Sequence, residues 1–207
     1  MSRRRYEVAK RAFDVALGTS VGAVVSPVLA GIAVAIKLES RGPVFFRQER
    51  VGRHGKPFRI IKFRTLVDEP ARSSGDYLIS ASDARITRVG AFLRRWSLDE
   101  LPQLWNVLRG DMSIVGPRPT LQYQVEQYDD FQRRRLEVPP GVTGWAQIAG
   151  RNILSWPERI ELDVWYVDHR SFWLDLRILL ATLPTLFRPG SIYNDAQADW
   201  GEQRSEV

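Results

Sequence analysis

Two adjacent carboxylates, Asp99 and Glu100, are the residues of this sequence best suited to chemistry. A carboxylate can act as a nucleophile, transfer protons or hold a divalent cation. Cationic side chains accompany the pair on a predicted strand, on a predicted helix and between two prolines: Lys62, Arg64, Arg94, Arg95 and Arg118. Arginine forks grip phosphate oxygens, and a divalent cation offsets the charge that repels an anionic nucleophile. A single arginine is more often a solvated surface charge, but the whole array suits a pyrophosphate.

The carboxylate pair also suits a structural role, because it stands at a predicted helix start. With Ser97 as N-cap, Glu100 falls at N3 and completes a capping box, but Pro102 then lies beyond the tolerated first turn. With Asp99 as N-cap, Pro102 falls at N3, where its missing N–H costs little. Either register places a carboxylate at the positive end of the helix dipole. Such a pair is more often only a cap, so the surrounding cations are what favour chemistry.

The elements that must position these residues follow from periodicity and turn signals. In chain order they are two short strands within 44–65 around a turn at 52–55, then helices over 86–96, from 97–100 to Gly110, over 121–135 and over 174–187. A Pro/Gly-rich passage separates the last two helices. We therefore expect an α+β fold, mainly helical, with a small β-hairpin.

Composition limits the possible chemistry. The chain has 207 residues, 44% of them hydrophobic and 26% charged, which is enough for one catalytic domain. Its net charge of +6 indicates an anionic partner, whether nucleic acid, anionic lipid or a phosphorylated substrate. The absence of cysteine excludes disulfides, thiolate metal sites and thiol nucleophiles. Two histidines, His54 and His169, argue against a histidine-rich metal site.

An apolar segment over 15–36 predicts attachment to a membrane. It contains about twenty uncharged residues, the length that matches a hydrocarbon core of roughly 30 Å. The main alternative is a secretory signal peptide, since Arg3, Arg4 and Arg5 resemble a basic start and small residues occur near Ala30. Asp14 interrupts the start of the segment, and the run is longer than the apolar core of most signal peptides, so we favour a membrane helix.

This membrane helix is predicted to turn back. Basic residues flank it on both sides, whereas a simple span should have its Lys/Arg excess at one end. Ser26-Pro27 lies in the middle, where proline removes a backbone donor and a serine hydroxyl can satisfy a freed backbone group. A break at this pair would let the helix leave by the face at which it entered. An ordinary kinked transmembrane helix is the alternative.

The motifs together resemble a known family. The strings KRAFD, SPVLAGIAVAIKLESRGPVFFRQERVGRHGKPFRIIKFRT, RVGAFLRRWSLDELPQLWNVLRGDMSIVGPRP, GVTGWAQIAGRN and LDVWYVD are similar to the bacterial sugar transferases, the monotopic polyprenyl-phosphate phosphoglycosyl transferases. The resemblance extends from Lys10 to Ile192 with the motifs in order. The chain resembles the minimal form of the family. A small departure is Leu66-Val67 after KFRT, where a methionine is common.

This resemblance implies a two-step transfer. Asp99 would attack the β-phosphate of a UDP-sugar, release UMP and carry the phosphosugar covalently until polyprenyl (undecaprenyl) phosphate accepts it. Mg²⁺ bound near Asp99 would bridge the diphosphate, and Glu100 would position groups or handle protons. The positions assigned to substrate binding are Lys62, Arg64, Arg94, Arg118 and Arg151, with Asp163 as a further active-site acid.

The resemblance also implies a place in the cell. Ser26-Pro27 matches the helix-breaking pair of the family, so we expect residues 1–40 to form a re-entrant membrane helix. Residues 41–194 would form the catalytic domain, with amphipathic interfacial helices around the active site, and 195–207 a disordered tail. The catalytic domain would lie on the cytoplasmic face of the bacterial inner membrane, in contact with membrane lipids. There it would begin the membrane stage of glycoconjugate (exopolysaccharide, capsule, O-antigen or glycoprotein) synthesis.

Two rival functions use the same positive charge. A non-catalytic module could grip anionic lipids through its basic strands and arginine-rich helix. A nucleic-acid-binding protein would leave the long apolar segment unexplained and would place the acidic pair Asp99-Glu100 beside phosphates, so no nucleic-acid partner is expected. Self-association into a homo-oligomer through the membrane helix is open, and the residues leave the identity of the sugar open as well.

Overall fold

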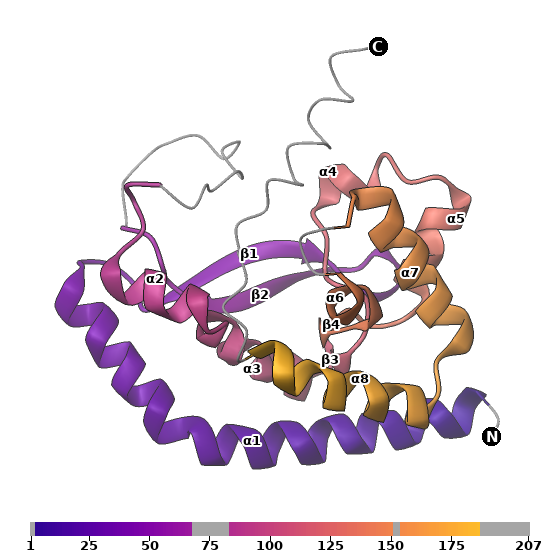
Figure 1. The fold of residues 1–207 in the computed structure, drawn as a ribbon, viewed down its shortest axis with the longest axis horizontal. Coiled ribbons are helices and arrows are strands. Elements are labelled where there is room, and N and C mark those ends of the chain that lie inside the picture. The colour runs from indigo at the N-terminus through magenta and orange to yellow at the C-terminus, as the bar shows by residue number, and fades with distance from the viewer. Residues whose placement is uncertain (1–2, 68–82, 151–153, 187–207) are drawn as a thin grey trace, which may run out of the picture.

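The computed structural model describes residues 3–67, 83–150 and 154–186 of the chain (Figure 1). Its elements are α1 (Arg3–Glu39), β1 (Phe45–Val51), η1 (Arg53–Gly55), β2 (Pro57–Phe63), α2 (Arg88–Arg95), η2 (Leu98–Gln103), α3 (Leu104–Arg109), β3 (Ser113–Val115), α4 (Gln122–Val125), α5 (Asp130–Arg133), η3 (Arg134–Glu137), β4 (Gly141–Thr143), α6 (Trp145–Ala149), α7 (Trp156–His169) and α8 (Phe172–Leu186). The described part is therefore mainly helical with little strand, as the sequence predicts. The predicted tail over 195–207 lies outside the described residues.

The apolar helix α1 is the longest element and bends along its course (Figure 1). Its most apolar 18-residue window has a mean hydropathy of 2.1 and is only 6% buried, so it is long and apolar enough to cross a membrane without being a core helix. The helix continues through Pro27, whose missing N–H frees the Ala23 carbonyl four residues earlier. The Ser26 hydroxyl donates a hydrogen bond of 2.8 Å to that carbonyl, as the sequence predicts for a freed backbone group. The sequence predicts a break at Ser26-Pro27, but the helical structure continues through this pair.

Buried polar contacts join α1 to the rest of the protein. The carboxylate of Asp14 accepts hydrogen bonds from the Ser113 hydroxyl at 2.7 Å and from the Ile114 N–H at 3.1 Å, both on β3. Arg11 donates to two carbonyls at the C-terminal end of α3, at 2.6 and 2.7 Å, where backbone acceptors lack helical partners. Asp14, which interrupts the apolar segment in the sequence, therefore anchors the helix to β3.

A second group of polar contacts joins α1 to α7 and α8. Asp175 of α8 accepts hydrogen bonds from Tyr6 at 2.8 Å, from Lys10 at 2.8 Å and from Tyr166 of α7 at 2.7 Å. Asp175 is 4% exposed, and its charge is matched by the ammonium of Lys10. Figure 1 shows the resulting arrangement, with α8 lying beside the N-terminal half of α1.

The predicted β-hairpin is confirmed by β1 and β2, which pair antiparallel in the register Phe46 with Lys62 and Val51 with Pro57. Its turn contains His54 and Gly55 with positive φ values of 58° and 77°, the combination that matches the twist of a tight hairpin. The hairpin thus carries Lys62 to the end of the sheet remote from the turn.

A second, parallel pairing was not predicted. β3 and β4 pair in parallel through Ser113 with Gly141 and Val115 with Thr143. These strands have three residues each, too short to produce a recognisable alternation in the sequence. They run through the largest core cluster, which includes Val107, Ile114 and Tyr166.

The helices after β3 differ from the prediction. A single helix over 121–135 is wrong, because the described chain forms the separate segments α4, α5 and η3 there. The restart at α5 has a local cause: the Asp129 side chain accepts a hydrogen bond from Gln132 N–H, and the Gln132 side-chain oxygen accepts one from Asp129 N–H. This capping box starts a new helix in the middle of the polar stretch. The apolar helix predicted over 174–187 is confirmed as α8.

Candidate active site

The acidic pair lies on a tight turn between α2 and α3. Ser97 follows α2 with φ 54°, a left-handed conformation that redirects the chain. The 3₁₀ helix η2 begins at Leu98 and contains Pro102, whose missing N–H is tolerated in this short piece. η2 packs against β2, the strand that carries Lys62.

Neither predicted cap register is present. Ser97 occupies the N-cap position, but its side chain makes no capping hydrogen bond, so the predicted capping box is wrong. The helix begins before Asp99, so Asp99 is not the N-cap either. The Glu100 carboxylate is bound instead by two cationic side chains through charge-assisted hydrogen bonds.

Glu100 is held by two cations from different parts of the chain. Lys62 Nζ of β2 and Arg118 Nη2 lie 2.7 and 2.8 Å from the same oxygen, Oε1 of Glu100. Burial alone would raise the pKa of Glu100, but the charges of Arg118 and Lys62 outweigh it and hold the pKa well below its usual range. Glu100 is therefore an ionised residue that keeps both cations in place.

Asp99 has a different environment from its neighbour. Its side chain is buried, with 8% of the residue exposed, and within the described ranges no donor is hydrogen-bonded to its carboxylate. Burial, followed by the neighbouring charge of Glu100, raises the pKa of Asp99 to about 6 against the opposing charges of three nearby cations. Among the described residues, Glu100 is thus hydrogen-bonded to two cations whereas Asp99 has no hydrogen-bond donor, the arrangement expected of a nucleophile with a supporting residue.

Arg94 is brought to this site by α2. Its Nε donates to the Thr65 hydroxyl at 2.9 Å, and its charge opposes the rise in the pKa of Asp99. The close approach of α2 to the end of the hairpin depends on Gly90, where a Cβ atom would lie 2.2 Å from the Thr65 carbonyl oxygen. Thr87 caps α2 by accepting a hydrogen bond from Gly90 N–H.

The hydrogen bonds of Arg64 are made to residues after α1 and not to Asp99 or Glu100. Its guanidinium donates to the Ser40 carbonyl and hydroxyl, at 2.9 and 2.8 Å, and to the Arg41 carbonyl at 2.8 Å. Arg64 is 6% exposed and joins the end of β2 to the end of α1. Its assignment to substrate binding stays a prediction.

Arg118 lies in a segment whose backbone is held through its carbonyls. Prolines on either side of Arg118 cannot donate hydrogen bonds. The Pro117 carbonyl accepts from Gly141 N–H at 2.8 Å, and the Thr120 carbonyl accepts from Val51 N–H at 2.9 Å. The two prolines and these contacts fix the segment that carries the guanidinium to Glu100.

Asp163 of α7 lies behind this segment and is only 2% exposed. Its Oδ2 accepts a hydrogen bond from Arg135 of η3, and both residues of this ion pair are buried. Burial raises the pKa of Asp163, although the charge of Arg135 opposes that rise. Sequence reasoning missed Arg135, because an arginine in a polar stretch gives no signal of burial. The assignment of Asp163 to substrate binding stays a prediction.

The two remaining assignments concern Arg151 and the metal. Arg151 lies outside the described residues. Among those described, no three His, Cys, Asp or Glu side chains form a group that could hold a metal ion. Mg²⁺ commonly binds through one or two carboxylates together with substrate phosphates, so the free carboxylate of Asp99 fits such an ion without further acidic ligands.

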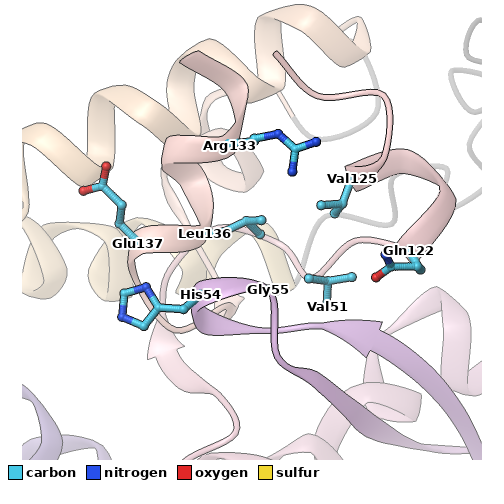
Figure 2. A pocket seen from close by; sticks show the side chains of 8 residues that line it. All are labelled: Val51, His54, Gly55, Gln122, Val125, Arg133, Leu136 and Glu137. Atoms are coloured by element: carbon cyan, nitrogen blue, oxygen red, sulfur yellow. The ribbon is translucent and has the colours of Figure 1, made fainter. Parts of the chain in front are cut away.

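A hollow in the described structure lies apart from these residues. Figure 2 shows it between the hairpin turn, α4 and η3, with a volume of about 350 Å³. Its lining residues are Val51, His54, Gly55, Gln122, Val125, Arg133, Leu136 and Glu137. None of them is a predicted site residue. A smaller hollow is lined by Arg118 and Arg135, among others.

Comparison with known proteins identifies the family. Residues 5–189 match the family described as bacterial sugar transferase. The chain is 48% identical over 176 residues to a protein of Bacillus subtilis named uncharacterized sugar transferase EpsL, covering 85% of this chain and 86% of the relative. It is 41% identical over 207 residues to a UDP-glucose:undecaprenyl-phosphate glucose-1-phosphate transferase of Caulobacter vibrioides, covering 93% of this chain and 75% of the relative.

Another relative is longer than this chain. A UDP-glucose:undecaprenyl-phosphate glucose-1-phosphate transferase of Escherichia coli is 44% identical over 185 residues, which are 84% of this chain but 39% of the relative. The extent of the family match and these identities show that the chain belongs to the bacterial sugar transferase family. It is a transferase, as the resemblance in its motifs predicts.

Proposed function

We propose that the protein transfers a sugar 1-phosphate from a UDP-sugar to polyprenyl (undecaprenyl) phosphate and releases UMP. The observation that carries the proposal is the contrast between the two carboxylates: Glu100 is bound by two cations, whereas Asp99 is buried, free of hydrogen-bond donors among the described residues and raised in pKa. The names of the Caulobacter vibrioides and Escherichia coli relatives state this type of reaction for those proteins.

In the first step, an oxygen of Asp99 attacks the β-phosphorus of the UDP-sugar. A bond forms between this oxygen and the β-phosphorus, and the bond from the β-phosphorus to the bridging oxygen breaks, so that UMP leaves with that oxygen. The product is a phosphosugar bound to Asp99 as an acyl phosphate. At neutral pH most Asp99 side chains are ionised, because the pKa is about 6.

In the second step, a phosphate oxygen of polyprenyl phosphate attacks the same phosphorus. The bond to Asp99 breaks, the carboxylate is restored, and the products are the polyprenyl diphosphate sugar and the free enzyme. Both steps transfer a phosphoryl group between anionic partners, so positioning and charge stabilisation supply most of the catalysis.

The cations around Glu100 serve this stabilisation. Lys62 and Arg118 are fixed by the same carboxylate oxygen and are near enough to Asp99 to lower its pKa. Their remaining N–H groups are available for phosphate oxygens, and Arg94 adds a third positive charge from α2. A magnesium ion held by Asp99 and the diphosphate would neutralise charge on the phosphates when bound.

The bent, apolar helix α1 supports a location of the protein at the membrane surface. We propose that α1 enters and leaves the inner membrane from the cytoplasmic face, bent near Ser26-Pro27, where the hydroxyl of Ser26 satisfies the carbonyl freed by Pro27. Exposed apolar side chains on α8, including Trp173, Leu180 and Leu183, then lie at the lipid interface beside α1. This geometry lets a soluble nucleotide-sugar and a lipid headgroup reach one site, as the first membrane step of glycoconjugate synthesis requires.

A turnover assay tests the proposal. Detergent-purified protein is supplied with Mg²⁺, undecaprenyl phosphate and a panel of UDP-sugars, and UMP release is measured for wild type and Asp99→Asn. Release with one sugar, lost in the variant, supports the reaction and identifies the donor. Release that persists in Asp99→Asn contradicts the role of Asp99. Absence of release with every sugar, together with wild-type binding to anionic vesicles, would favour a lipid-binding module.

A further inference from the structure

Arg135 and Asp163 form a buried ion pair directly behind the segment that carries Arg118. Arg135 is 3% exposed and Asp163 is 2% exposed, so neither offers an accessible surface to a substrate. Arg135 Nη2 donates both to Asp163 Oδ2 and, at 3.0 Å, to the carbonyl oxygen of Arg118. One guanidinium nitrogen thus joins the ion pair to the backbone of a residue that faces the catalytic centre.

The other contacts of Arg135 fix its orientation. Its Nη1 donates to the Tyr128 hydroxyl at 2.6 Å. Its guanidinium lies 5.7 Å from the centroid of the Tyr128 ring and 5.6 Å from that of the Trp156 ring, both within the range of cation–π attraction. A buried arginine is costly unless its charge is matched and its N–H groups are bonded, and Asp163 supplies the matching charge. Asp163 therefore stabilises Arg135 in the position from which it reaches Arg118.

We infer that Arg135 and Asp163 are positioning residues, which act on the transfer reaction by holding Arg118 against Glu100. This inference rests on the proposed function and deepens it. The chain of contacts runs from Asp163 to Arg135, then through the backbone of Arg118 to its guanidinium, 2.8 Å from Glu100 Oε1. It assigns Asp163 an indirect role in place of the predicted contact with substrate.

The position of Arg118 makes such support necessary. The prolines on either side of it remove two backbone donors, so this segment depends on donors from other elements. Arg135 donates to the carbonyl of Arg118 itself, whereas the carbonyls of Pro117 and Thr120 accept backbone donors and that of Pro119 accepts from Arg50 at 3.5 Å. Loss of Arg135 would free the one residue of this segment whose side chain reaches Glu100.

A double-mutant cycle in kinetics tests the inference. The four proteins are wild type, Arg118→Ala, Arg135→Lys and the double variant, each assayed for UMP release with saturating polyprenyl phosphate. We expect kcat/KM to fall about 100-fold in Arg118→Ala, as when one donor that stabilises charge in the transition state is removed. We expect a roughly 10-fold fall in Arg135→Lys, and a double variant within about threefold of Arg118→Ala alone. Losses that multiply to about 1,000-fold would overturn the inference, because Arg135 would then act independently of Arg118.

Two control variants separate positioning from general damage. Arg134→Gln removes the neighbouring arginine, whose ion pair with Asp168 of α7 is exposed, and should leave kcat/KM within twofold of wild type. Tyr128→Phe removes one hydrogen bond of Arg135 but spares the bond to Arg118, so it should lower Tm while changing kcat/KM less than threefold. A loss in Tyr128→Phe as large as that in Arg135→Lys would contradict the route through Arg118.

A structural measurement distinguishes failure of the inference from failure of the proposed function. In an experimental structure of Arg135→Lys, Arg118 Nη2 should leave hydrogen-bonding distance of Glu100 Oε1, which is 2.8 Å in the native protein. An unchanged contact would overturn the inference even if the wild-type enzyme turned over. A wild-type protein without UMP release would instead refute the proposed function, and the displacement of Arg118 would still decide the positioning role.

Discussion

Lys62 Nζ and Glu100 Oε1 lie 2.7 Å apart, and this contact joins the β-hairpin to the turn that carries the acidic pair. The two residues are 38 positions apart in the chain. Because Arg118 binds the same oxygen, Glu100 holds two cations whose charges act on Asp99. The carboxylate of Glu100 therefore holds Lys62 and Arg118 in place.

Glu100→Gln should lower kcat for UMP release by about 100-fold, because the amide no longer fixes two cations by charge. The fall should appear in steady-state rates with saturating UDP-sugar and Mg²⁺. Glu126→Gln, on the exposed face of the short helices, provides a matched control and should retain the wild-type rate. A Glu100→Gln enzyme of nearly wild-type rate would show that Glu100 does not organise the site.

The rate of UMP release should fall as the pH drops through about 6. Burial and then the charge of Glu100 raise the pKa of Asp99 to that value, and only the ionised carboxylate can attack phosphorus. In Glu100→Gln the charge that raises this pKa is removed, so the acid limb should move to lower pH. A pH–rate profile of both proteins measures the shift. A limb that moved to higher pH would contradict the assignment of this titration to Asp99.

Gly90→Ala should destabilise the protein by about 1–3 kcal/mol and reduce its activity. The new Cβ would lie 2.2 Å from the Thr65 carbonyl oxygen, so α2 must move away from the hairpin and carry Arg94 with it. Thermal unfolding in detergent and the UMP-release rate are the measurements. Gly22→Ala is the matched control, because nothing lies within 4 Å of a Cβ atom there. Equal behaviour of the two variants would argue against close packing at Gly90.

Asp14→Ala should cost about 2–4 kcal/mol of unfolding free energy, because it leaves two buried donors on β3 without an acceptor. Chemical denaturation followed by circular dichroism can measure the loss. Glu161→Ala, at an exposed position on α7, should stay within about 0.5 kcal/mol of wild type. If Asp14→Ala were as stable as this control, the carboxylate would not anchor α1.

The topology of α1 can be tested by labelling, since the chain has no native cysteine. Arg3→Cys and Arg47→Cys should both react with a membrane-impermeant maleimide from the cytoplasmic side of intact vesicles, because a re-entrant helix leaves both flanks on one face. Each variant is first shown to retain UMP release. Reaction of the two positions from opposite sides would establish a spanning helix and contradict the re-entrant model.

Part of the site could be predicted from the sequence because its chemistry is carried by residue type and motif. Lys62, Arg94 and Arg118 were assigned to one site with Asp99 and Glu100, and the structure brings Lys62 and Arg118 to one oxygen of Glu100. The hairpin and the helices α2, α3 and α8 follow from alternation and periodicity, whereas α7 and the division of 121–135 into α4, α5 and η3 were not predicted. The existence of the hairpin and of these three helices could therefore be predicted, even where their ends could not.

What the sequence did not reveal depends on long-range contacts. The bond from Arg135 to the Arg118 carbonyl and the ion pair with Asp163 join residues 17 and 28 positions apart, and no local pattern encodes them. The cap of the acidic turn was mispredicted for a similar reason. Glu100 is bound by Lys62 and Arg118, and these tertiary contacts replaced the local capping box that residue spacing favoured.

The attachment of Asp14 to β3 also imposes an order on biosynthesis. Its partners Ser113 and Ile114 follow it by 99 and 100 residues, so at about 5–20 residues per second the ribosome needs roughly 5–20 s to supply them. The apolar part of α1 is completed early in this interval, by residue 36, while the carboxylate that will anchor it still has no protein partner from β3. In the proposed membrane location, insertion of the nascent helix could therefore precede its docking, and the rest of the chain would then fold onto a helix that is already in the bilayer.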